Sequence, residues 1–308
     1  MIRFVFKRFL GLIPTLLVII VASFLIIRLA PGSPFTQDRA VPKSVLVEIE
    51  AKYGLDKPLP VQLGHYLMRL AHGDFGPSTK YPQRSVNEII AEGLPITLTL
   101  SLVALAWALL VGVGAGIIGA VRQNSKWDQA AMAFAMLGIS IPTFVLGPLL
   151  VLLFSLHWYL LPPGGFGEWR HVILPGITLG TAYAAYFARL TRAGLLEVTR
   201  SDYIRTAHAK GLPESTVIFR HMLRGGLLPV VTFLGPAIAH LMVGSVIVEK
   251  IFNIPGIGPY FVDAAFNRDY GLVMGIVVLE SALLLMMNLL VDVMYAVLDP
   301  RIRLQGAP

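Results

Sequence analysis

Three ionisable side chains, His240, Glu280 and Asp292, stand inside otherwise apolar stretches of the chain. If these stretches cross a membrane, such groups are costly to bury and mark a path for a solute or a proton. We assign Glu280 and His240 to a candidate translocation path. The plainer alternative is that both are hydrogen-bonded inside a helix bundle. Asp292 lies one helical turn from Asn288, which is typical of a polar contact between helices.

Motifs for enzyme chemistry are missing from the sequence. No G-x-x-x-x-G-K-[ST] segment occurs, so this chain cannot bind ATP through a P-loop. H-E-x-x-H and G-x-S-x-G are also missing, there is no cysteine, and the seven histidines are scattered. We therefore expect no catalytic residue, no metal and no cofactor in this chain, and an enzyme is the weaker class.

The composition indicates a membrane protein. Of the 308 residues, 56% are apolar and 14% are charged, against about 25% charged residues in ordinary soluble domains. So few charges could not cover the surface of soluble domains of this length. The net charge of +7 raises the hypothesis of nucleic-acid binding, but the position of the basic residues beside the apolar stretches accounts for it better. We expect no nucleic-acid partner.

Six apolar stretches are long enough to cross a bilayer, which takes about 20 residues each. They are Phe9–Ile27, Leu94–Val121, Ala130–Leu156, Val172–Ala188, Gly225–Val248 and Gly271–Leu298. Pro142 and Pro148 favour kinks in the third stretch. Close helix packing is expected at four glycines of the second stretch, Gly112, Gly114, Gly116 and Gly119. The predicted fold class is an all-α polytopic membrane protein with six transmembrane helices.

The distribution of basic residues predicts the orientation of these helices. With the N-terminus inside, the cytoplasmic segments hold 14 Lys and Arg in 61 residues, and the outer segments hold 10 in 102. This excess of basic residues favours cytoplasmic placement of both termini. We interpret the first stretch as a retained helix, because its 19 apolar residues exceed the roughly 7–15 of a signal peptide.

The predicted organisation has four parts. Residues 1–28 form an N-terminal transmembrane helix, 29–93 an extracytoplasmic subdomain, 94–298 a five-helix transmembrane core and 299–308 a cytoplasmic tail. Short helices are predicted in the subdomain at Ser44–Tyr53, Leu63–Leu70 and Ser85–Ala91. The outer loop 249–270 is unusually apolar, so we expect it to pack against the 29–93 subdomain or against another protein and to contain a short helix at Tyr260–Phe266. A simple packed connector is the alternative.

The longest cytoplasmic insertion, 189–224, is predicted to hold two short helices. Thr199–Lys210 is compatible with a helix, Gly211 suits the position just past its end, and Pro213 suits the first turn of the next helix. Tyr203 and Ala207 share one face at i,i+4 spacing. We interpret the insertion as a docking element; a solvated connecting loop is the alternative.

One part of this insertion resembles the coupling-loop signature of binding-protein-dependent ABC importer permeases, in the form of the dipeptide and oligopeptide branch. It reads Arg205-Thr206-Ala207-His208-Ala209-Lys210-Gly211-Leu212, followed by Ile218-Phe219-Arg220-His221 and Pro229. The general motif begins with Glu-Ala-Ala, whereas Arg205-Thr206-Ala207 stands here, as in the peptide branch.

The resemblance extends over nearly the whole chain and is nearest to the first permease subunit of oligopeptide importers. Its other segments are Ile26-Ile27-Arg28-Leu29-Ala30-Pro31-Gly32-Ser33-Pro34, Gly73-Asp74-Phe75-Gly76-Pro77-Ser78, Ile254-Pro255-Gly256-Ile257-Gly258, Asn267-Arg268-Asp269-Tyr270 and Asp299-Pro300-Arg301.

What this resemblance implies is a type I ABC importer permease in the bacterial plasma (inner) membrane. It implies a second homologous permease subunit, two cytoplasmic ATPase subunits that bind ATP and Mg, and an extracytoplasmic peptide-binding protein. The residues expected to couple the chain to the ATPase are Tyr203, Ala207, Lys210, Gly211 and Pro213. The alternatives are a proton-coupled secondary transporter that uses Glu280 and Asp292, a permease for nickel or another non-peptide solute, and a receptor or scaffold without transport.

Overall fold

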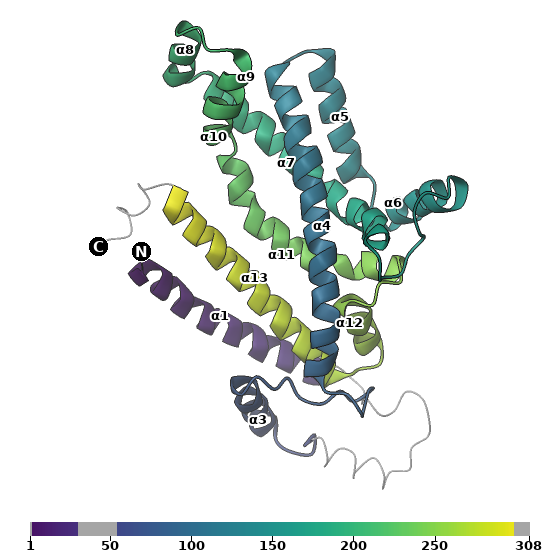
Figure 1. Ribbon diagram of the computed structural model, residues 1–308. Coiled ribbons are helices and arrows are strands. Elements are labelled where there is room, and N and C mark those ends of the chain that lie inside the picture. Colours follow the sequence, from purple (N-terminus) through teal and green to yellow (C-terminus); the bar gives the residue numbers. More distant parts are fainter. Residues whose placement is uncertain (1, 30–53, 299–308) are drawn as a thin grey trace. The chain divides into compact units, whose positions relative to one another are not determined.

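The computed structural model describes residues 2–29 and 54–298, and in this part of the chain the regular secondary structure is helical (Figure 1). Two compact units divide the chain. Unit 1 comprises Met1–Ile96 and Pro255–Met286, and unit 2 comprises Thr97–Ile254 and Met287–Pro308. The predicted helix Ser44–Tyr53 and the tail 299–308 lie outside the described residues.

Four described helices are long and apolar enough to cross a membrane, and a bent pair adds a fifth candidate. The four are Arg8–Leu29, Val86–Val121, Leu228–Ile251 and Tyr270–Val293. The pair Lys126–Ser140 and Thr143–His157 bends by 106°, and Pro142 lies at the bend, as the sequence predicts. The predicted fourth span lies in α7 (Ile173–Thr199), which continues past Arg189 and Arg192 and is not among the four.

Unit 1 is built around two apolar clusters. Its helices are α1 (Ile2–Leu29), α3 (Leu59–Ala71), the start of α4 (Val86–Val121), α12 (Ile257–Phe266) and the start of α13 (Tyr270–Leu298). Ile20 and Phe24 of α1 pack with Met274 of α13 in one cluster. Ile89 of α4 packs with Leu272 of α13 in the other.

The start of α4 corrects one prediction. Ser85–Ala91 is not a separate short helix, because α4 runs unbroken from Val86. Ser85 and Glu88 form a reciprocal cap, in which the Glu88 N–H donates to Ser85 Oγ at 3.2 Å and the Ser85 N–H donates to Glu88 Oε2 at 3.1 Å. This cap satisfies two backbone N–H groups at the start of α4. The helix is therefore stably begun at Val86 and continues into the apolar stretch without a second helix start.

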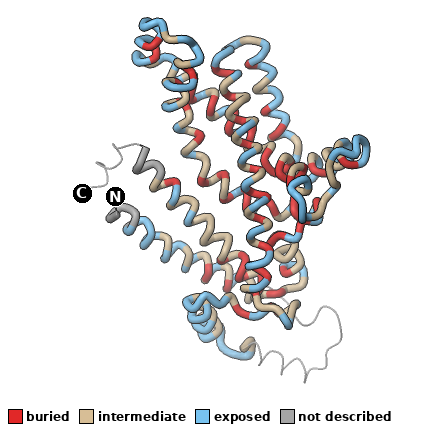
Figure 2. Tube along the Cα trace, viewed as in Figure 1, coloured by how far each residue is buried: buried red, intermediate tan, exposed pale blue. Residues whose placement is uncertain are grey.

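Unit 2 contains the remaining described helices. They are the rest of α4, α5 (Lys126–Ser140), α6 (Thr143–Leu150), η1 (Val151–His157), η2 (Trp169–Val172), α7, α8 (Asp202–Ala209), α9 (Glu214–Thr216), η3 (Val217–Met222), α10 (Leu223–Gly226), α11 (Leu228–Ile251) and the end of α13. Buried positions are dense along α7, which packs against α5, α10 and α11 (Figure 2). The core of this unit therefore lies around α7.

Glycines let α4 and α7 approach closely. A Cβ at Gly112 would lie 2.8 Å from Phe187 Cβ, and one at Gly116 would lie 2.6 Å from the Ala188 carbonyl oxygen. Neither position has room for a side chain. Gly119 is also tightly packed, whereas Gly114 has no atom within 4 Å of an added Cβ. The predicted close packing is therefore confirmed for three of the four glycines.

Candidate functional site

The predicted coupling element forms a helical hairpin, residues 202–226, which we call the α8–α10 hairpin. In unit 2 it lies beyond the end of α7 (Figure 1). α8 begins after Ser201, whose hydroxyl donates to the Val198 carbonyl oxygen at 2.6 Å. α8 ends at Ala209, within one residue of the prediction, but it begins at Asp202 and not at the predicted Thr199, which is the last residue of α7.

Gly211 turns the chain between the two arms of the hairpin. Its φ is +72°, a left-handed conformation that glycine adopts at little cost. The Gly211 N–H donates to the His208 carbonyl oxygen at 2.9 Å, and the Leu212 N–H donates to the Ala207 carbonyl oxygen at 3.3 Å. These bonds end α8 in the way that the sequence predicts for a glycine just past a helix.

Pro213 begins the second arm but lies one position earlier than predicted. It is the residue before α9, not part of its first turn. Its carbonyl oxygen accepts from the N–H groups of Thr216 at 2.9 Å and Val217 at 3.1 Å. An N-cap carbonyl accepts the first helical bonds in this way, and a proline there has no N–H to leave unsatisfied.

The inner face of the hairpin is apolar. Ile204 and Ala207 of α8 pack against Val217 and Met222 of the second arm, and Leu195 of α7 joins the same cluster. Ala207 is therefore buried between the arms, where its small side chain lets them approach closely. Its predicted contact with an ATPase stays a prediction, as do those of Tyr203, Lys210, Gly211 and Pro213.

A close backbone contact joins the hairpin to α7. A Cβ added at Gly194 of α7 would overlap the carbonyl oxygen of Gly226 in α10, and one at Gly226 would lie 3.1 Å from Leu195 Cα. The Tyr203 hydroxyl lies 3.1 Å from the position of a Cβ at Gly225. At Gly194 the contact is with the backbone of α10 itself, so the hairpin and α7 are suited to move together.

The outer face of the hairpin is basic and partly aromatic. Tyr203 is 49% exposed and Phe219 is 67% exposed. Arg205 and Lys210 are exposed on the same hairpin. His208 Nε2 lies 3.0 Å from Glu214 Oε2, which links the two arms. The exposed Phe219 lies inside the signature segment, but its exposure could not be read from apolar spacing alone.

An ion pair at the same end of unit 2 holds the α4–α5 turn against α7. Arg192 donates to both carboxylate oxygens of Asp128, at 2.7 Å each, and the Asn124 N–H donates to Asp128 Oδ2 at 2.9 Å. Asp128 is buried, so the pair is desolvated on one side. The Arg192 guanidinium thus fixes a turn 64 residues away in the sequence.

A buried carboxylate that sequence reasoning missed lies at the end of α11. Glu249 has no exposed surface, and its Oε1 accepts from the hydroxyls of Thr97 at 2.8 Å and Ser245 at 2.9 Å. The sequence indicates only that Glu249 ends an apolar stretch. Ser245, four residues earlier, was the available signal, because it lies on the same helix face.

The candidate path residues lie in different units. Glu280, in unit 1, is partly buried on α13. His240, in unit 2, is exposed on α11, and its Nδ1 lies 2.7 Å from the Pro236 carbonyl oxygen. This local hydrogen bond fits the alternative of a satisfied polar residue. Both remain predictions as path residues.

A buried carboxylate also organises unit 1. Asp269 accepts at 3.1 Å from each of the backbone N–H groups of Thr79, Lys80 and Leu272, and it bonds the Ser78 hydroxyl. It has no exposed surface. We call this group the Asp269 junction. It joins two of the signature segments, the one ending at Ser78 and the one from Asn267 to Tyr270.

The apolar loop 249–270 packs within its own chain. Phe252 and Ile254 are buried in unit 2, and the Phe252 carbonyl oxygen accepts from the Gly165 N–H at 2.7 Å. Ile257 is buried in unit 1, at the start of α12. α12 extends the predicted helix by three residues at its N-terminal end.

Among the described residues, no group of three or more His, Asp or Glu side chains is arranged to hold a metal ion. The described polar groups above are instead engaged in capping and in joining helices.

Family models account for most of the chain. The model described as binding-protein-dependent transport system inner membrane component matches residues 112–304. The chain belongs to this family. The model for the N-terminal part of such membrane components matches residues 1–101. The chain is therefore a permease component of a binding-protein-dependent ABC importer.

Curated relatives match over their full length. The oligopeptide transport system permease protein OppB of Haemophilus influenzae is 48% identical over 305 residues, which are 98% of this chain and 100% of the relative. OppB of Escherichia coli K12 is 48% identical over 307 residues, with the same coverage. The dipeptide transport system permease protein DppB of Bacillus subtilis is 43% identical over 304 residues, 99% of each chain.

Solved structures support the fold. A chain of the MetNI methionine ABC transporter, in an inward-facing conformation, superposes with a TM-score of 0.59 at 16% identity. The match covers 68% of this chain and 96% of that one. The type I ABC importer permease fold expected from the sequence is thus confirmed.

Proposed function

We propose that this permease moves oligopeptides from an extracytoplasmic binding protein into the cytoplasm. The observation that carries the proposal is the full-length identity of 48% to relatives named oligopeptide permeases, against 43% to a named dipeptide permease. The proton-coupled and nickel alternatives have no comparable support among these relatives.

The proposed partners follow from the family. A second homologous permease completes the path, two cytoplasmic ATPase subunits bind ATP and Mg, and a peptide-binding protein delivers the substrate. The sequence has no P-loop motif, which supports ATP hydrolysis outside this chain. Glu280 and His240 are the proposed residues of the path.

The α8–α10 hairpin is the proposed contact with an ATPase subunit. Its exposed Tyr203, Arg205 and Lys210 face outward from a packed inner face. Gly211 and Pro213 set the angle between its arms. A rigid element of this kind transmits displacement of the ATPase to α7 through the contact of Gly194 with Gly226.

The proposed location is the bacterial inner membrane, with both termini in the cytoplasm. A reporter that is active only in the cytoplasm should be active when fused after Lys210 and silent when fused after Lys80. The argument is the excess of basic residues in the segments assigned to the cytoplasm. The reverse pattern would invert the proposed topology.

Transport in proteoliposomes tests the function. The permease pair, both ATPase subunits and the binding protein should take up a labelled oligopeptide when ATP is supplied. Uptake should stop without ATP and continue when the proton gradient is collapsed. Uptake that instead follows the proton gradient, or that is competed by nickel and not by peptides, would refute the proposal.

A further inference from the structure

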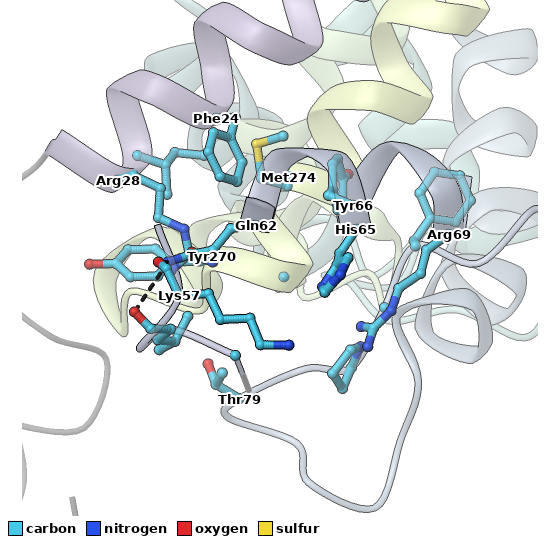
Figure 3. Close-up of a pocket in the computed structure, with 17 residues that line it drawn as sticks. Phe24, Arg28, Lys57, Gln62, His65, Tyr66, Arg69, Thr79, Tyr270 and Met274 are labelled. Atoms are coloured by element: carbon cyan, nitrogen blue, oxygen red, sulfur yellow. Dashed lines mark hydrogen bonds between the residues drawn. The ribbon is translucent and has the colours of Figure 1, made fainter. Parts of the chain in front are cut away.

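Unit 1 contains a cavity of about 220 Å³ whose described lining holds several basic groups and no carboxylate (Figure 3). Arg28 comes from the last turn of α1, Lys57 from the segment before α3, and His65 and Arg69 from α3 itself. The side chains of these residues surround the cavity in Figure 3. The cavity is distinct from the α8–α10 hairpin, which belongs to unit 2.

The basic groups are not neutralised within the described part of the chain. No ion pair there involves Arg28, Lys57 or Arg69. The Arg28 guanidinium carbon lies 5.5 Å from the ring centre of Phe24 and 5.2 Å from that of Tyr270, so stacking orients this group without cancelling its charge. The cavity is therefore an electropositive pocket that favours an anion.

Two buried polar atoms beside the cavity call for a further hydrogen-bonding group. Gln62 Oε1 and the Tyr66 hydroxyl are buried and have no hydrogen-bond partner among the described residues. Gln62 Nε2 donates to the carbonyl oxygens of Leu55, at 3.1 Å, and Lys57, at 2.7 Å. Its Oε1 is therefore left as a hydrogen-bond acceptor. Burial raises the pKa of Tyr66, which keeps its hydroxyl protonated as a donor. A ligand that combines an anion with a hydroxyl would satisfy both atoms.

Much of the remaining wall of the cavity is apolar. Phe24 and Ile27 of α1 and Met274 of α13 line it. Both helices are long and apolar enough to cross a membrane, and only 11% of the apolar window of α1 is buried. Arg28 stands one residue from the end of this apolar helix. Basic side chains at the end of a membrane span, next to apolar side chains, are suited to the boundary of the bilayer. There the basic groups can contact lipid headgroups and the apolar groups can contact acyl chains.

We propose that this cavity binds the headgroup of an anionic phospholipid that carries hydroxyl groups, such as phosphatidylglycerol. Arg28, Lys57 and Arg69 hold the phosphate, Gln62 and Tyr66 hold a glycerol hydroxyl, and Phe24, Ile27 and Met274 contact the start of the acyl chains. Placement in the outer leaflet rests on the proposed topology, whereas lipid binding itself does not depend on it.

The test uses the full chain and native mass spectrometry after exchange into phosphatidylglycerol or phosphatidylcholine with the same acyl chains. The wild type should retain phosphatidylglycerol preferentially. The double variant Lys57→Gln/Arg69→Gln should lower this preference about tenfold, because each basic group near a headgroup contributes attraction. Both side chains are exposed, so the fold should persist, which an unchanged Tm would verify.

Arg84→Gln is the matched control. It removes one positive charge from the same unit, but Arg84 is paired with Glu92 and does not line the cavity. It should leave the lipid preference unchanged. An equal loss in the control variant would mean that general surface charge, not the cavity, attracts the lipid, and would refute the site.

Two further arms separate the ligand classes. Phosphatidylethanol has the phosphate but lacks the hydroxyls of the glycerol headgroup. The wild type should therefore prefer phosphatidylglycerol to phosphatidylethanol, and Tyr66→Phe should remove that preference.

Millimolar inorganic phosphate should not displace the lipid. Displacement by phosphate would show a site for a soluble anion, and a wild type without any lipid preference would mean that another group fills the cavity. Either result would overturn the proposal.

Discussion

The Asp269 junction of unit 1 and the α8–α10 hairpin of unit 2 are built in opposite ways. At the junction one buried carboxylate holds three backbone N–H groups and a hydroxyl, and its partners lie up to 191 residues away in the sequence. The hairpin is held by an apolar cluster and close glycine contacts, almost all within residues 194–226. The structure of the junction therefore depends on hydrogen bonds to one charged group, and the structure of the hairpin depends on close packing.

This difference predicts different failures. Removing one acceptor at the junction leaves several buried donors unsatisfied at once, so the whole unit should lose stability. A change in the shape of the hairpin should leave the fold largely intact but misdirect its exposed face. The junction is therefore expected to be a stability element, and the hairpin a coupling element.

The largest effect is expected for Asp269→Ala. The substitution removes the acceptor of the Thr79, Lys80 and Leu272 N–H groups and should destabilise the fold by about 3 kcal/mol or more. Thermal unfolding of the purified protein in detergent would measure it. Asp56→Ala, at an exposed position of the same unit, is the control and should change little. If both variants unfold alike, the junction is not a stability element.

A smaller effect on stability is expected for Gly194→Ala. The new Cβ would overlap the Gly226 carbonyl oxygen, so α7 and α10 must separate, at a cost of about 1–3 kcal/mol. We expect the protein to remain in the membrane, with peptide uptake strongly reduced. Gly114→Ala, where there is no atom within 4 Å of a Cβ, should transport normally. Full uptake by Gly194→Ala would show that the contact does not serve coupling.

The smallest effect on stability is expected for Gly211→Val. The left-handed conformation costs a residue with a Cβ about 1–2 kcal/mol, and the surrounding space is open. Expression should persist while uptake falls steeply, because the second arm is misdirected. Gly211→Asn should recover part of the uptake, since asparagine tolerates this conformation. Normal transport by the valine variant would contradict the coupling assignment.

The same comparison explains which features the sequence could predict. Gly211 and the C-terminal end of α8 were predictable because capping depends on neighbouring residues. The Asp269 junction was not, because nothing local links Ser78 to Asp269. The contact of Arg192 with Asp128 could not be predicted for the same reason, since Asp128 lies 64 residues away. The separate helix Ser85–Ala91 was a wrong prediction, because α4 begins at Val86 behind the Ser85–Glu88 cap and continues directly into the apolar stretch.

Site prediction was limited in a similar way. The sequence singled out Glu280 and His240 because charge in an apolar stretch is conspicuous. Glu249 was not predicted as a site residue because it stands at the end of such a stretch. It is nevertheless fully buried, and its carboxylate accepts hydrogen bonds from the hydroxyls of Thr97 and Ser245. Burial at the end of a helix depends on tertiary packing, which apolar periodicity does not report.

Site-directed crosslinking tests the central claim, that the α8–α10 hairpin is the contact with an ATPase subunit. The chain has no cysteine, so a single cysteine at Arg205, whose side chain is 73% exposed, can be paired with cysteines on the ATPase. The account predicts a crosslink from Arg205→Cys that responds to nucleotide, and none from Lys80→Cys in unit 1. A crosslink from Lys80→Cys with none from Arg205→Cys would contradict it.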